Sequence, residues 1–443
     1  MAHSTTRTIR RTALAAAITI PAVVMTLVGC GTSGPTAPGA DSATMWALSG
    51  QPKEGIRQGT VDDFNENHPD GTLSVTFFQN DAYKTKIRTA IGAGQAPTLI
   101  YGWGGGTLKS YVEAGQVEDL TDFFADNPEL KDKLFDSPFG AATIDDRIYA
   151  MPVQDVQPIV LFYNKEIFDE AGVTPPETWD DLLDLVDTFN AAGIAPISLG
   201  GQSRWTSMMW LEYLFDRVGG PEVFDAIFAG EADAWSNPDA LKALEMAQEL
   251  VAADGFVKGF ASITADSNAD QALLYTGKAA MMLHGGWTYG PMKNDGAGFV
   301  QDGKLGWAEF PVIDGGKGDP ANVVGNPSNF FSISSAATDE QKEIAKNYLK
   351  DGLFTDYEID ALIDGGGVPV VNGIEDRLAA TDDGDYLTFV YNLAGNAPNF
   401  QQSWDQALNP TAAEALLNNI DQLFSRSITP QQFADNMNKT IGQ

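Results

Sequence analysis

Apolar and polar positions between residues 43 and 106 follow two periods in turn, one typical of strands and the other of helices. Apolar side chains alternate with polar ones over 73–77, and they recur at helical spacing over 56–64. The predicted elements are strands at 43–48, 73–77 and 98–101, helices at 56–64 and 83–91, and a glycine-rich loop at 102–106. This order of strands and helices predicts a parallel sheet with helices on its faces.

The loops that follow the three predicted strands would meet at one edge of that sheet. These loops are 49–51, 80–81 and 102–103. Ligands of open α/β sheets bind in the crevice beyond the carboxyl ends of the strands. The pattern therefore predicts a ligand-binding site at this edge.

A second α/β unit is predicted after residue 154. Its clearest helix starts at Thr178, which is an N-cap residue with Asp181 three positions later, and Gly193 ends it. A strand at 194–199 follows. Further amphipathic helices are predicted at 238–251 and 339–349, so that the α/β character continues through the chain.

The N-terminus has the pattern of a secretory signal rather than of a domain. Basic residues precede the apolar run 13–28, which is shorter than the about 20 residues of a membrane span. The run ends in Leu27-Val28-Gly29-Cys30, which resembles the bacterial lipobox. We therefore predict a lipoprotein signal peptide over 1–29, lipidation of Cys30, and a flexible tether over 30–41 that holds the protein at the outer face of the cell membrane.

Composition narrows the possible functions. The chain of 443 residues has 27 Lys and Arg against 60 Asp and Glu, a net charge of −33, which argues against nucleic acid as a partner. The one cysteine excludes an internal disulfide. No phosphate-loop, serine-hydrolase or zinc-protease motif occurs, and a calcium-loop fragment at 266–270 breaks down where Gln271 replaces the required glycine. We expect no metal or cofactor, and we interpret His284 as a structural residue.

Tryptophans in loops with glycine and amide residues are the strongest functional signal. Trp103, Trp205 and Trp287 follow or lie in glycine-rich loops, and Trp404 stands among glutamine, serine and aspartate. An indole face suits the C–H face of a sugar ring, and amides and carboxylates suit its hydroxyls. The pattern favours a carbohydrate site. We assign Trp179, Trp210, Trp235 and Trp307 to the core and leave Trp46 open.

Four stretches resemble extracellular solute-binding proteins of family 1, the sugar receptors of carbohydrate-importing ABC transporters. They are the G-x-x-P segment 90–98, in which Thr98 replaces an aspartate, the two-part stretch made of 148–152 and 161–165, the P-x-T-W helix start at 174–179, and the G-K-A-A-M segment 277–287. Their order and spacing extend the resemblance over 41–443.

This resemblance implies a periplasmic-binding-protein-like α/β fold, in which two α/β lobes are joined by a multi-crossing hinge and enclose a ligand cleft. The crossings are expected near 152–154, 310–312 and 365–369. The expected boundaries are 42–153 plus 312–366 for the first lobe and 154–311 plus 367–443 for the second.

The resemblance also implies a function without chemistry on the ligand. The residues expected to contact the ligand are Asn80, Asp81, Trp103, Gln154, Asp155, Trp205, Trp287, Asn326, Asn329 and Trp404. The protein is expected to be a monomer that captures a di- or oligosaccharide, with xylobiose as the first candidate, and delivers it to the permease of an ABC transporter. Two alternatives stay open, namely a secreted enzyme that acts on glycosides and a receptor for a non-sugar solute such as a polyamine or a metal chelate.

Overall fold

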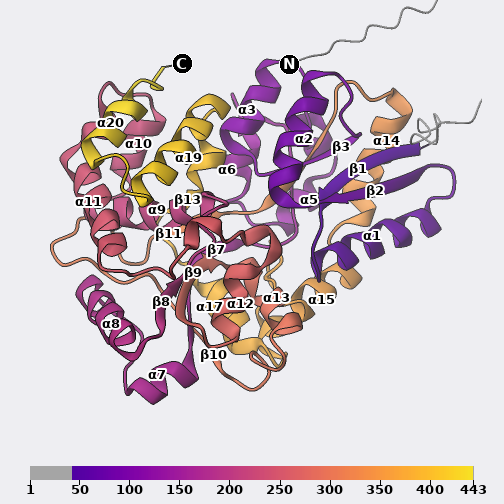
Figure 1. Ribbon diagram of the computed structural model, residues 1–443. Coiled ribbons are helices and arrows are strands. Elements are labelled where there is room, and N and C mark those ends of the chain that lie inside the picture. The colour runs from indigo at the N-terminus through magenta and orange to yellow at the C-terminus, as the bar shows by residue number, and fades with distance from the viewer. Residues whose placement is uncertain (1–41, 443) are drawn as a thin grey trace, which may run out of the picture. The chain divides into compact units, whose positions relative to one another are not determined.

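Two β-sheets organise the part of the chain that the computed structural model describes, residues 42–442 (Figure 1). The predicted signal peptide, Cys30 and the tether lie outside these residues. We call each sheet, together with the helices that pack on it, a lobe. Within residues 42–442, every helix is too short or too polar to cross a membrane.

The sheet of the first lobe has the strand order β2-β1-β3-β12-β6. Its strands are β1 (Ser42–Leu48), β2 (Thr72–Phe78), β3 (Leu99–Gly102), β6 (Met151–Val153) and β12 (Asn329–Ile333). Strand β1 pairs in parallel with both β2 and β3, and α1 (Lys53–Asn67) and α2 (Asn80–Gly92) connect them. The parallel βαβαβ unit predicted from the hydrophobic pattern is therefore present.

Helices from distant parts of the sequence complete the first lobe. In Figure 1, α14 lies beside β1 and β2, although it is more than two hundred residues away in the chain. The remaining elements of this lobe are α3 (Gly105–Glu113), α4 (Thr121–Asp126), α5 (Pro128–Lys133), α6 (Phe139–Ala142), β4 (Thr143–Ile144), β5 (Arg147–Ile148), α14 (Asp339–Asn347), the π-helix η5 (Tyr348–Gly352) and α15 (Asp356–Asp364).

The sheet of the second lobe has the order β13-β11-β7-β9-β8, with β10 beside β7. Its strands are β7 (Gln157–Asn164), β8 (Ala195–Ser198), β9 (Ala279–Gly285), β10 (Leu305–Ala308), β11 (Val323–Asn326) and β13 (Phe400–Gln402). Every residue of β9 is buried, which agrees with its continuous apolar run from Ala279 to Leu283.

The helices of the second lobe follow strong local signals. Thr178 and Asp181 form a reciprocal capping box at the start of α8 (Trp179–Ala192), and Gly193 ends the helix with φ 74°. Helix α9 (Trp205–Gly219) is buried almost throughout because α11 (Pro238–Ala252), α19 (Pro410–Phe424) and the sheet all pack on it.

Shorter elements complete this lobe. They are α7 (Lys165–Ala171), α10 (Glu222–Phe228), η1 (Ala234–Ser236), η2 (Phe260–Ser262), η3 (Ala265–Ser267), α12 (Ala269–Tyr275), η4 (Gly286–Thr288), α13 (Tyr289–Asp295), α16 (Glu375–Ala379), α17 (Gly384–Gly395), α18 (Trp404–Ala407) and α20 (Pro430–Asn438).

The chain passes between the two sheets at three places. The first passage joins β6 to β7 through residues 154–156. The third passage runs beside the first, because the Val156 amide donates to the Val368 carbonyl at 2.9 Å and the Val370 amide to the Gln154 carbonyl at 3.1 Å. Backbone hydrogen bonds therefore join the first and third hinge passages to each other.

The position predicted for the second passage is wrong. Val312 lies beside Thr178 within the second lobe, and β11 pairs there with β7 and β13. The chain crosses only at Pro327 and Ser328, between β11 and β12. The lobe boundary predicted at 312 therefore moves to 327, because the apolar stretch at 310–312 packs within the second lobe instead of leaving it.

The third boundary also shifts. After the passage at 365–369, the Phe135 amide donates to the Val370 carbonyl at 3.0 Å, and the Asn372 amide donates to the Lys133 carbonyl at 2.9 Å. These bonds tie residues 370–372 to the first lobe. The start predicted at 367 for the last segment of the second lobe is therefore too early.

Candidate ligand-binding site

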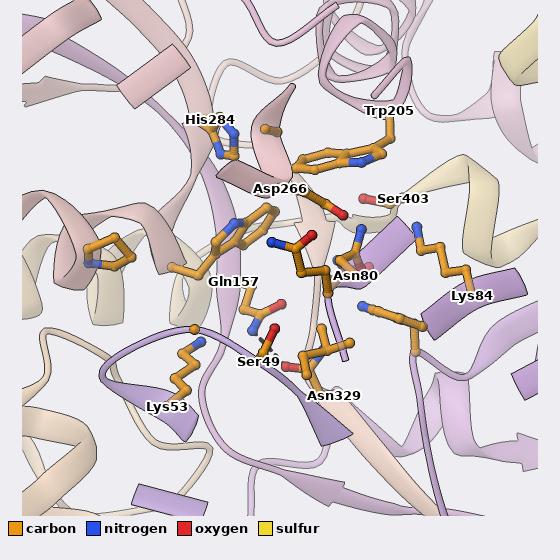
Figure 2. A pocket seen from close by; sticks show the side chains of 18 of the residues that line it. Ser49, Lys53, Asn80, Lys84, Gln157, Trp205, Asp266, His284, Asn329 and Ser403 are labelled. Atoms are coloured by element: carbon orange, nitrogen blue, oxygen red, sulfur yellow. Dashed lines mark hydrogen bonds between the residues drawn. The ribbon is translucent and has the colours of Figure 1, made fainter. Parts of the chain in front are cut away.

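A cavity of about 220 Å³ lies where the two sheets meet (Figure 2). A single water needs about 10–15 Å³ in this measure, so the cavity has room for a much larger ligand. The loop 49–51 after β1, Asn80 after β2 and Trp103 after β3 all line it. The edge of the sheet at which the hydrophobic pattern predicts a ligand is therefore the edge that faces the cavity.

Two ion pairs neutralise the lysines of the cavity wall. The ammonium of Lys53 lies 2.6 Å from a carboxylate oxygen of Asp155, and that of Lys84 lies 2.9 Å from a carboxylate oxygen of Asp405. Lys84 also stands 5.0 Å from the ring centroid of Trp103. Each cation has its own acid, so this part of the wall presents polar groups with little net charge.

Trp205 and Trp287 form the aromatic wall on the side of the second lobe. Their ring centroids are 6.2 Å apart, and His284 contacts both rings edge-on at 5.4 and 5.5 Å. A Cβ atom on Gly285 would lie 1.8 Å from the ring of Trp287. Only glycine at position 285 leaves room for the indole, which explains the glycine two residues before Trp287.

The hinge contributes amide side chains. Gln154 adopts a left-handed φ of 70°, uncommon outside glycine, and its Oε1 accepts a hydrogen bond from the Tyr101 hydroxyl at 3.2 Å. The Gln157 amide donates to Oδ1 of Asn329 at 2.7 Å. Asn326 lines the cavity with its Oδ1 buried and without a hydrogen-bond partner. Residues in and next to the hinge passages therefore line the cavity with amide side chains.

Most of the predicted ligand contacts come together at this cavity. The predicted residues that line it are Asn80, Trp103, Gln154, Trp205, Trp287, Asn326 and Asn329. Two further residues lie next to the cavity wall without lining it. Asp155 is buried behind the wall in its pair with Lys53, and Oδ1 of Asp81 accepts a hydrogen bond from the Trp205 indole N–H at 3.3 Å.

The position expected for Trp404 is wrong. Its side chain is fully buried and stacks on Phe224 with ring centroids 4.8 Å apart and an interplanar angle of 4°. Its backbone N–H donates to the buried carboxylate of Glu212 at 2.7 Å, which holds the start of α18 against α9. The neighbouring residues Ser403, Asp405 and Gln406 line the cavity instead.

Several cavity residues were not selected from the sequence. They are Lys53, Lys84, Gln157, Met208, Met209, Asp266, Gln271, His284, Ser403, Asp405 and Gln406. Gln271 was noted only as the residue that breaks a calcium pattern, and His284 was interpreted as structural. His284 is indeed buried, but it lines the cavity between Trp205 and Trp287. No local pattern marks these residues, because they come from many separate segments that meet only in the folded chain.

The charges of the site do not form a metal centre. Among residues 42–442, no group of three or more His, Cys, Asp or Glu side chains is arranged to hold a metal ion. Burial raises the pKa of Asp266, and the nearby Asp81 carboxylate adds to the rise, while a hydrogen bond from the Asp81 amide opposes it.

Comparison with known proteins shows the family of the chain. The family described as bacterial extracellular solute-binding protein matches residues 49–350, more than half of the chain. The chain belongs to this family. The resemblance found in the sequence motifs is thereby confirmed.

Curated relatives of this solute-binding protein match it over part of their length. It is 30% identical over 246 residues to a probable sugar-binding periplasmic protein of Mesorhizobium japonicum. The matched residues are 53% of this chain and 54% of the relative. It is 24% identical over 261 residues to the xylose/arabinose-binding protein XacG of Haloferax volcanii, covering 58% and 55%. The chain thus spans about half the length of the curated relatives it matches.

Solved structures match this solute-binding protein over nearly the whole described chain. One, from work on xylan utilization by the thermophilic bacterium Caldanaerobius polysaccharolyticus, has a TM-score of 0.81 and 30% identity, covering 90% of this chain and 100% of that one. A chitin oligosaccharide binding protein has a TM-score of 0.80 and 25% identity, covering 90% and 97%. The two-lobed α/β fold of the family is therefore the fold of this protein.

Proposed function

We propose that this solute-binding protein captures an uncharged di- or oligosaccharide between its lobes and delivers it to the permease of an ABC transporter. The observation that carries the proposal is the pair Trp205 and Trp287, which line the cavity together with amide side chains next to the hinge. Indole faces suit the C–H faces of sugar rings, and amides suit their hydroxyls. Since Lys53 and Lys84 are each paired with an acid, the wall favours a neutral sugar over an acidic one.

Closure of the lobes would couple sugar binding to delivery. The amide of Gln402 in the second lobe donates to the Trp103 carbonyl in the first at 2.6 Å, and Lys84 reaches Asp405 across the same boundary. A sugar that touches both walls has a higher affinity for the closed arrangement and shifts the population toward it. The permease would then recognise the closed form, and no bond in the sugar is made or broken.

Xylobiose or a longer xylo-oligosaccharide is our first candidate ligand. The support is the structural likeness, at 30% identity, to a protein studied in xylan utilization. A chito-oligosaccharide is the next candidate, because a chitin oligosaccharide binding protein is nearly as similar in fold. We further propose that the protein works as a monomer, lipid-anchored through Cys30 at the outer face of the membrane.

A thermal-shift screen of the purified protein against xylo-, cello- and chito-oligosaccharides tests this proposal. A specific sugar at one hundred times its dissociation constant should stabilise the protein by about 2.7 kcal/mol. A shift confined to one class of sugar would identify the ligand. Stability unchanged by every sugar, in protein free of co-purified ligand, would contradict the proposal, and release of shorter sugars would point to an enzyme.

A further inference from the structure

Three residues of the second lobe leave polar atoms without a partner at the cavity wall. They are Asp266 in η3, Gln271 in α12 and His284 in β9, and all three line the cavity. The buried atoms without a hydrogen-bond partner are Oδ1 of Asp266, Oε1 of Gln271 and Nε2 of His284. Buried polar atoms are almost always paired in folded proteins, so a group of unpaired ones around one cavity points to a ligand that pairs them.

The hydrogen bonds around His284 determine what this wall offers. The Gly285 amide donates to Nδ1 of His284 at 2.9 Å, so Nδ1 is the acceptor and Nε2 carries the proton. Oδ2 of Asp270 lies 3.3 Å from Nε2, outside hydrogen-bond geometry, and is itself unpaired. The unpaired atoms of these cavity-lining residues are therefore one donor, on His284, and two acceptors, on Asp266 and Gln271. A sugar hydroxyl can serve both kinds of group, because it donates one hydrogen bond and accepts others.

Asp266 also contacts the first lobe. Its Oδ2 accepts a hydrogen bond at 2.9 Å from the backbone amide of Asp81, at the N-terminus of α2. Trp205 lies beside Asp266 in Figure 2, and its indole N–H donates a hydrogen bond to the side chain of Asp81. Figure 2 places Asp266, Trp205 and His284 on one side of the cavity, across from Ser49, Lys53 and Asn329. One carboxylate of a cavity-lining residue thus has an oxygen bound to the opposite lobe and a second, buried oxygen without a hydrogen-bond partner.

We propose that Asp266, Gln271 and His284 form a hydroxyl-recognition subsite for the sugar ring that lies against Trp205 and Trp287. In this subsite Asp266 links recognition to closure, since the carboxylate that binds a ligand hydroxyl also holds the N-terminus of α2. The inference rests on the proposed function and extends it to the residues that select among sugars. A sugar without a hydroxyl at this place leaves the buried atoms unpaired and binds more weakly.

Substitutions at Asp266 separate its two contacts. Asp266→Asn keeps one oxygen to accept the Asp81 amide and replaces the unpaired oxygen by a donor, whereas Asp266→Ala removes both contacts. Gln271→Leu removes the second acceptor without touching the first lobe. Ser267→Ala is the matched control, because Ser267 lies in the same helical turn, is exposed and does not line the cavity.

Calorimetric titration with xylobiose, cellobiose and diacetylchitobiose gives the affinities, and small-angle scattering with and without the bound disaccharide gives the degree of closure. For the disaccharide that binds the wild type, we expect at least about a tenfold loss of affinity in Asp266→Ala, Asp266→Asn and Gln271→Leu, and less than a twofold change in Ser267→Ala. Asp266→Asn should still contract on saturation, whereas Asp266→Ala should contract less. Among the monodeoxy derivatives of that disaccharide, one should bind the wild type at least tenfold more weakly and bind Asp266→Ala as well as the parent sugar does.

Two results would overturn the inference. If Asp266→Ala and Gln271→Leu bind within threefold of the wild type, the subsite is wrong while the proposed function stands. If the wild type binds none of the three disaccharides or their longer homologues, the proposed function fails and the subsite fails with it.

Discussion

The second lobe contains two aromatic clusters that look alike in sequence and differ in use. Trp205 and Trp287 are partly buried, contact each other across the cavity wall and surround His284. Trp404 is fully buried against Phe224 and Trp235, and its indole N–H is paired with Oε1 of Gln401 at 2.8 Å.

The difference shows that polar neighbours in the sequence do not decide whether an indole faces a ligand. Both clusters have amides, glycines or acids beside their tryptophans. What separates them is the cavity, which Trp205, Trp287 and His284 line and Trp404 does not. Unpaired buried atoms occur beside both clusters, at Nε2 of His284 and at Oε2 of Glu212, whose Oε1 accepts the Trp404 amide. Such atoms therefore point to a ligand only where their residues also line a cavity.

Among the substitutions in the two clusters, removal of the ring of Trp404 should have the largest effect on the stability of the protein. Trp404→Ala leaves a large cavity in the core of the second lobe, and we expect the free energy of unfolding to fall by about 3–5 kcal/mol. Urea denaturation followed by circular dichroism measures the loss. A loss below about 1 kcal/mol would show that this ring is not part of the core.

Removal of either cavity indole should instead lower the affinity for sugar more than the stability of the protein. Trp205→Ala and Trp287→Ala should each weaken sugar binding well over tenfold, because a stacking face and its buried area are lost. Their free energy of unfolding should change by less than that of Trp404→Ala, since both rings are partly exposed. Calorimetric titration, with urea denaturation as the control for folding, checks both. Unchanged affinity in both variants would remove these residues from the site.

Glu212 accepts the backbone N–H of Trp404 and allows a finer test of the core cluster. Burial raises the pKa of Glu212 to about 8, the hydrogen bond from the Trp404 amide opposes the rise, and the Asp405 carboxylate adds to it. In the unfolded chain this carboxyl ionises near pH ~4.3. Between these two pH values the folded state binds one more proton than the unfolded state, so the stability of the folded state decreases as pH rises and levels off above about 8.

Glu212→Gln removes this titration and keeps an acceptor for the Trp404 amide. The variant should match the wild type in stability below pH ~4.3 and exceed it at pH 8 by at least about 1 kcal/mol. Urea denaturation at several pH values measures the gap. A gap that stays constant across this range would show that Glu212 keeps its ordinary pKa in the fold.

The sequence predicted the part of the site that depends on strand ends. Asn80 and Trp103 follow strands whose alternation is visible, so their place at one sheet edge follows from the parallel order. The sequence did not predict Asp266, Gln271 or His284 as binding residues. Their partners lie in other segments, and the absence of a hydrogen bond at their polar atoms becomes visible only in the folded chain.

By itself, the sequence determined the features that arise from neighbouring residues. The parallel unit of 42–102, the capping box at Thr178 and the left-handed turn at Gly193 follow from local spacing, side-chain hydrogen bonding and glycine's freedom of φ. Only the tertiary structure decided that the second passage lies at Pro327, that Trp404 is buried and that Asp266 contacts α2. Each of these depends on which distant segments pack together. The free energy of that packing arises only when the segments are in contact, so neither segment alone reveals it.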